Sequence, residues 1–196
     1  MGILSLLLLT PAIGILILAL VPGQNTNQIR LVANVIAAVA FLLSCWLVVI
    51  YDIQDGSLQF TEQFVLNPKL GTAFALGVDG LSLPMVVLAT LLTSIALLAS
   101  FNITNSVKGY HISILMLQFG MVGVFLSQDW SLFYIFWELT LIPLFLLIAR
   151  WGGVRRNVAS INFVLYTMGG SIFMLISLLA ISQYMPVHGG TLMSSM

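Results

Sequence analysis

The sequence predicts an all-α integral membrane protein with six transmembrane helices, and three observations lead to that fold class. Hydrophobic residues make up 60% of the chain and charged residues only 6%, whereas a soluble globular domain carries about 25% charged residues. Six stretches are apolar over a length that can cross a bilayer, for which a helix needs about 20 residues. The charged residues between these stretches are sorted by sign between the two sides.

The six expected helices follow one another without a soluble domain, so residues 1–196 are predicted to form a single membrane domain. The first stretch lacks a positively charged start and a small-residue cleavage site, which favours a retained helix over a signal peptide. The last stretch is long enough to tilt. The helices are expected at about residues 3–21, 31–51, 81–101, 110–127, 131–150 and 158–184.

The longest connection, residues 52–80, shows the pattern of two short strands. Apolar side chains alternate with others over residues 58–66, where Glu62 interrupts them, and alternate again over residues 74–78. Residues 67–71 between them contain the proline and glycine that are typical of a turn. The pattern predicts a β-hairpin on the outer surface, with an irregular loop as the alternative.

Basic residues gather on one side of the predicted membrane domain. The connections after the first, third and fifth helices carry no acid, and their basic residues are Arg30, Lys108, Arg150, Arg155 and Arg156. The other side has a single base, Lys69, beside Asp52, Asp55, Glu62, Asp79 and Asp129. Because Lys and Arg accumulate on the cytoplasmic side, the N-terminus is predicted to face the periplasm or, in a thylakoid, the lumen.

The fifth helix contains one ionisable side chain deep in its span, Glu138. Trp130 and Trp151 bracket this helix and lie 21 residues apart, which is about 31 Å and matches the hydrocarbon thickness. Glu138 therefore lies near the midplane, where a charge costs roughly 2.5–3.5 kcal/mol. We predict that Glu138 is a proton relay. A glutamate that only joins two helices by hydrogen bonds is the alternative.

Four further residues are candidates for supporting Glu138. Tyr134 lies one turn earlier on the same helix face. Pro143 cannot donate to the carbonyl four residues before it, which frees an acceptor for water; a plain helix kink is the alternative. Asn162 and Tyr166 lie one turn apart in the last helix, and they either line a hydrated path or bond to a neighbouring helix.

The sequence excludes several classes of function. It contains no nucleotide-binding loop, no dinucleotide-binding fingerprint and no haem motif. A single cysteine, Cys45, rules out a cysteine-held iron–sulfur cluster and a disulfide within the chain. No basic stripe exists that could bind a nucleic acid backbone. We therefore expect no cofactor, metal or redox site in this chain, no nucleic acid partner, and the lipid bilayer as its surroundings.

Three motifs resemble one known family. The run L-F-Y-I-F-W-E-L-T-L-I-P-L-F-L-L-I-A-R-W-G-G, residues 132–153, resembles the fifth helix of subunit 4 of respiratory complex I, a member of the antiporter-like family. G-V-D-G-L-S-L-P, residues 77–84, resembles the family's third helix at its start. F-V-L-Y-T-M-G-G-S, residues 163–171, looks most like the cyanobacterial and chloroplast branch, and the resemblance covers nearly the whole chain.

The resemblance implies the N-terminal part of a larger antiporter-like helical bundle. It implies a proton-translocating subunit of a type I NAD(P)H- or ferredoxin:plastoquinone oxidoreductase in a thylakoid or bacterial inner membrane. The partners would be other membrane-arm subunits of a large complex, in which other chains carry iron–sulfur clusters and use quinone. Glu138 would face a lysine on a later helix. Relatives often carry a lysine where this sequence has Asn162, which weakens the case for proton uptake there.

Two other functions remain open on the residues alone. A subunit of a multisubunit cation/proton antiporter would share the glutamate of the fifth helix, although the Gly169–Ser171 segment favours the oxidoreductase. A structural or assembly membrane protein would have no transport role. Whether the complex would serve respiration, cyclic electron flow or carbon dioxide uptake also stays open.

Overall fold

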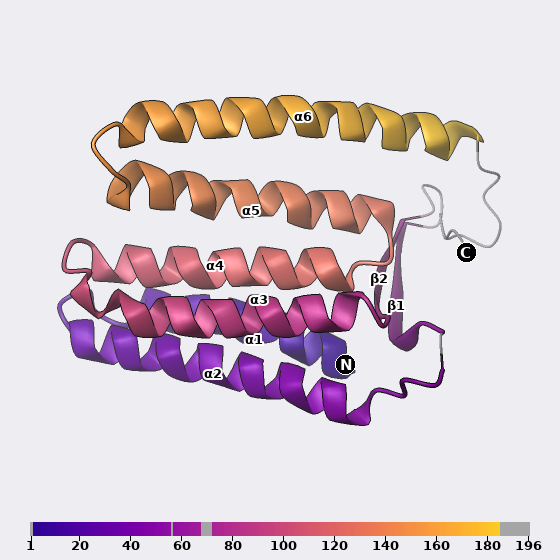
Figure 1. The fold of residues 1–196 in the computed structure, drawn as a ribbon, viewed down its shortest axis with the longest axis horizontal. Coiled ribbons are helices and arrows are strands. Elements are labelled where there is room, and N and C mark those ends of the chain that lie inside the picture. The colour runs from indigo at the N-terminus through magenta and orange to yellow at the C-terminus, as the bar shows by residue number, and fades with distance from the viewer. Residues whose placement is uncertain (1, 56, 68–71, 185–196) are drawn as a thin grey trace.

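The structure, a computed structural model, describes residues 2–55, 57–67 and 72–184. Six helices in that part of the chain are long and apolar enough to cross a membrane, and they run alternately in opposite directions (Figure 1). The predicted six-helix membrane fold is confirmed. The helices are α1 (Ile3–Leu20), α2 (Thr26–Ile50), α3 (Ser82–Ala99), α4 (Val107–Leu126), α5 (Trp130–Trp151) and α6 (Arg156–Tyr184), with a short 3₁₀ turn, η1 (Ser100–Asn102), after α3.

Helix α4 is the centre of the bundle, because it contacts α1, α2, α3 and α5. Two glycines allow α5 to approach it closely. A Cβ atom on Gly123 would overlap the ring of Phe136, and one on Gly120 would lie 2.7 Å from the Cγ2 atom of Thr140. Small residues at a membrane helix interface permit such contact. Helix α6 lies beyond α5 at the edge of the bundle (Figure 1), and few of its described side chains are buried.

Basic side chains bind free carbonyl groups at the inner end, which is the end that carries the connections after α1, α3 and α5. Helix α2 begins earlier than predicted, so Arg30 lies inside the helix rather than in a loop. Its guanidinium donates to the carbonyl of Ile103 at 3.0 Å. Lys108 Nζ donates to the carbonyls of Ala19 and Val21 at 2.8 and 2.9 Å. The two bonds of Lys108 satisfy acceptors that the C-terminus of α1 leaves free.

A two-stranded antiparallel sheet confirms the predicted hairpin. Its strands are β1 (Gln59–Asn67) and β2 (Thr72–Val78), and the sheet lies across the outer end of the bundle (Figure 1). Of the predicted turn, residues 68–71 lie outside the described residues. The backbone N–H of Gln128, in the α4–α5 connection, donates to the carbonyl of Ala75 at 2.9 Å. Strand β2 is therefore held between β1 and that connection.

Glu62 joins the sheet to the first helix. Its carboxylate accepts hydrogen bonds from the backbone N–H groups of Gly2, Leu4 and Ser5 and from the Ser5 hydroxyl. Partial burial opposes ionisation, but the hydrogen bonds of Ser5, Gly2 and Leu4 together outweigh it and lower the pKa of Glu62 below its ordinary value of 4.5. A negative group at a helix N-terminus is stabilising. The acid that interrupts the strand pattern thus caps α1.

Candidate functional site

Helix α5 carries the candidate carboxylate, and Asp129 determines where this helix begins. Asp129 is 1% exposed, and its side chain accepts from the backbone N–H groups of Ser131 and Leu132 at 2.8 and 3.2 Å. Such a cap satisfies two of the donors that a helix start leaves free. Glu138 follows the first residue of α5 by eight positions, or about 12 Å along the axis. The cap therefore sets the depth of Glu138.

The carboxyl group of Glu138 is only partly satisfied. The side chain is half-buried, and its Oε1 atom is enclosed without a hydrogen-bond partner among the described residues. A buried polar atom left unpaired costs about 1–3 kcal/mol. The hydroxyl of Tyr134 interacts with this carboxyl group and with the hydroxyl of Ser171 on α6. The carboxyl group thus lies where α5 meets α6, with one oxygen able to bind a proton or a water molecule.

Pro143 lies on the same helix as Glu138 and does not interrupt it. Helix α5 continues through this residue, which is buried. The proline ring removes the hydrogen bond to the carbonyl four residues earlier. That carbonyl belongs to Leu139, the residue next to Glu138. A backbone acceptor without its helical donor is therefore expected on the residue next to Glu138.

Asn162 and Tyr166 lie away from the α5–α6 contact. Both side chains are exposed, Tyr166 by 82%, whereas Ser160 and Ser171 of the same helix are buried. The structure therefore brings Tyr134, but not the Asn162–Tyr166 pair, to Glu138. Ser171 was not predicted to take part. A hydroxyl next to two glycines in an apolar helix was the signal that could have identified it.

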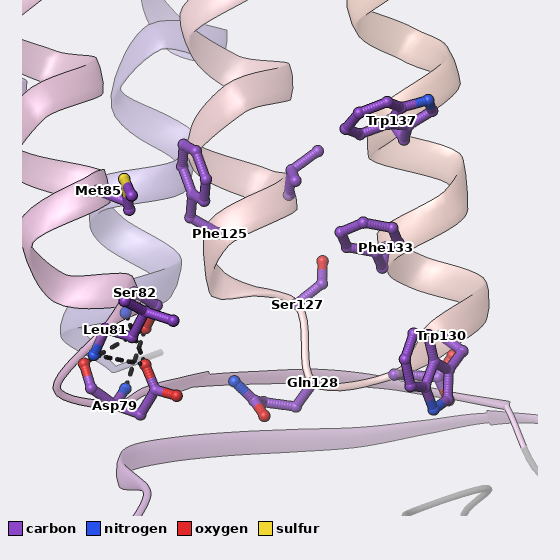
Figure 2. Close-up of a pocket in the computed structure, with 12 residues that line it drawn as sticks. Asp79, Leu81, Ser82, Met85, Phe125, Ser127, Gln128, Trp130, Phe133 and Trp137 are labelled. Carbon is purple, nitrogen blue, oxygen red and sulfur yellow. Dashed lines mark hydrogen bonds between the residues drawn. The ribbon is translucent and has the colours of Figure 1, made fainter. Parts of the chain in front are cut away.

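A groove lies at the outer end of the bundle and is lined by residues of α3, α4 and α5 (Figure 2). Its volume is about 710 Å³. Phe125, Phe133 and Trp137 form part of its apolar wall, and Asp79 and Gln128 lie at its polar rim. Twelve residues line it and Glu138 lies elsewhere. The groove is therefore separate from the α5–α6 site.

The described residues do not assemble a metal centre. No three or more His, Cys, Asp or Glu side chains lie close enough together to hold a metal ion in residues 2–55, 57–67 and 72–184. The candidate site accordingly consists of a carboxyl group, two hydroxyl groups and a freed backbone carbonyl. Such a set can bind water and exchange a proton with it.

Sequence comparison identifies relatives across the chain. Residues 127–194 match the family described as NADH:quinone oxidoreductase/Mrp antiporter, TM. The "NAD(P)H-quinone oxidoreductase chain 4 1" of Picosynechococcus sp. is 41% identical over 89% of this chain and 33% of its own length. The chloroplastic "NAD(P)H-quinone oxidoreductase chain 4" of Chara vulgaris is 37% identical over 92% of this chain and 37% of its own length. The chain thus spans about a third of these relatives.

Solved structures share the fold. A chain of respiratory complex I from Thermus thermophilus is similar with a TM-score of 0.77 and 28% identity, over 90% of this chain and 35% of that one. A chain of the Mrp complex from Dietzia sp. is similar with a TM-score of 0.70 over 87% of this chain and 18% of that one. At 20% identity, the second likeness concerns the fold alone.

Proposed function

We propose that this chain, which belongs to the NADH:quinone oxidoreductase/Mrp antiporter family as a relative of chain 4, translocates protons within a type I NAD(P)H- or ferredoxin:plastoquinone oxidoreductase. The observation that carries this proposal is the enclosed, unpaired Oε1 atom of Glu138 in the described chain. Ionisable residues within transmembrane segments mark ion and proton pathways. Glu138 takes and releases the proton, and Tyr134 orients its carboxyl group.

The proposal assigns the redox chemistry to other chains of the complex. Iron–sulfur clusters and quinone belong to partners, and this chain binds other membrane-arm subunits. The apolar surface of α6 supports such contacts, since large side chains such as Phe173 and Leu165 are 73% and 64% exposed. The cyanobacterial and chloroplastic names of the relatives support a thylakoid or bacterial inner membrane.

Purification with partners tests the proposed complex. We expect the tagged natural protein, solubilised from its own membrane, to copurify with iron–sulfur proteins and with quinone-reducing activity. Recovery with only the membrane subunits of a cation/proton antiporter would contradict the proposal. So would recovery of the protein alone as a stable monomer, because a polar group in the bilayer must find partners.

The orientation of the chain is also a proposal. The N-terminus and the hairpin face the periplasm or lumen, and the α5–α6 connection faces the cytoplasm or stroma, because the basic residues lie at that inner end. We expect cysteines introduced at the exposed positions Gln54 and Asn157, in a variant whose Cys45 is replaced by alanine, to be labelled from opposite sides of sealed vesicles. Labelling of both from one side would contradict the six-span topology.

A further inference from the structure

Helix α4 contains two completely buried polar side chains that the Glu138 site does not use. His111 and Gln118 are both 0% exposed and lie seven residues apart, which places them on one face of the helix. Gly120 and Gly123 mark the opposite face, because they contact α5. His111 and Gln118 therefore point into the bundle of α1, α2 and α3, on the other side of α4 from Glu138.

The hydrogen bond of His111 determines which of its ring nitrogens is free. Its Nδ1 atom lies 2.8 Å from the carbonyl oxygen of Val107. A carbonyl only accepts, so Nδ1 carries the hydrogen and, in the neutral ring, Nε2 is an acceptor. Nε2 is buried and no described group bonds to it. His111 thus presents one unpaired acceptor inside the bundle.

Arg30 of α2 presents the complementary unpaired donor. One terminal nitrogen of its guanidinium is held by the carbonyl of Ile103. Its Nε–H group is buried and lacks a partner within the described chain. Ile103 lies just before α4 begins, and His111 lies in the second turn of that helix. An unpaired donor and an unpaired acceptor therefore both lie at the inner end of the bundle, where α2 contacts α4.

We propose that ordered water bridges Arg30 and His111, accepting a hydrogen bond from Nε–H of Arg30 and donating one to Nε2 of His111. Each buried atom left unpaired would cost about 1–3 kcal/mol, and most buried polar groups in proteins are paired with protein or water. A water molecule can make both bonds at once, and buried waters typically bridge groups of this kind. No charge or proton needs to move for this site to form.

Gln118 marks a second water site deeper in the same bundle. Both its Oε1 and its Nε2 are buried, and neither has a partner among the residues described. It lies about 10 Å further along α4 than His111, between two apolar clusters. Helix α4 contributes Leu115 to the inner cluster and Val122 to the outer one. Water at Gln118 would hydrate the middle of the bundle independently of Glu138.

Radical footprinting of the assembled complex tests the first site. X-rays split bound water into radicals that oxidise the side chain beside it, so we expect His111 to be oxidised although it is closed to bulk solvent. Arg30→Met keeps the apolar stem but removes the donor, and oxidation of His111 should fall several-fold. Arg155→Met changes an exposed arginine of the same inner end and should leave the oxidation unchanged.

Two results would overturn the proposal. One is an unoxidised His111 in the wild-type complex, and the other is equal oxidation in the Arg30→Met complex. A density map of the wild-type complex gives a test that does not depend on any variant folding. We expect water peaks within about 2.7–3.2 Å of Arg30 Nε, His111 Nε2 and the Gln118 amide. Direct bonds from protein groups to these atoms, or empty space beside them, would rule the water sites out.

Discussion

Replacing Glu138 with glutamine is expected to leave the complex assembled and to abolish most of its proton pumping. Glutamine keeps the volume of the side chain and can still bond to Tyr134, but it cannot release a proton. The unpaired Oε1 atom in the described chain is the atom at which protonation would occur. Proton uptake into sealed vesicles, normalised to the amount of assembled complex, measures the effect.

The two roles considered for Glu138 predict different pumping activities for the Glu138→Asp and Glu138→Gln variants. If it is a relay, Glu138→Asp retains part of the pumping because the acid survives one methylene shorter, while Glu138→Gln loses most of it. If Glu138 only joins α5 to α6, the Glu138→Gln substitution has almost no effect on proton pumping. An amide also makes interhelical hydrogen bonds, which are worth about 0.6–2 kcal/mol. Wild-type pumping in the Glu138→Gln complex would therefore end the relay hypothesis.

Replacing Glu62 with glutamine is expected to lower stability by about 1–3 kcal/mol and to leave pumping per assembled complex unchanged. The carboxylate accepts from Gly2, Leu4 and Ser5, whereas an amide would turn one donor group toward these donors. The thermal midpoint of the purified complex measures the loss. Glu62 and Glu138 are the two glutamates of the chain, so each substitution serves as the matched control for the other.

The stability difference at Glu62 should depend on pH in a defined direction. The pKa of Glu62 is lowered in the folded protein from its ordinary value of 4.5, so its stabilising effect is complete above that value. The effect is lost as pH falls through the lowered pKa, because the wild-type carboxylate is then protonated as well. The gap in thermal midpoint between wild type and Glu62→Gln should therefore narrow below pH 4.5. An equal gap at neutral and acidic pH would contradict the capping role.

Much of the architecture follows from the sequence because its causes are local. Moving apolar side chains into lipid determines which segments span the membrane, and the tryptophans at the two ends of α5 indicate the depth of Glu138. Alternating side chains with a turn between them indicate the hairpin. The proline in α5 removes the hydrogen bond to the carbonyl four residues before it, whichever neighbours the helix packs against. Each of these depends on residues close together in the chain.

The tertiary structure decided which way each polar side chain points. Asn162 and Tyr166 lie one turn apart on α6 and were expected to line a hydrated path or to bond a neighbouring helix, yet both are exposed. Ser171 reaches Tyr134 instead. The bond from Glu62 to the start of α1 joins residues about 60 positions apart, which no local pattern reveals. In lipid both the outer and the packed face of a helix are apolar. Hydropathy therefore determines the depth of a residue, and only helix packing determines the direction in which it faces.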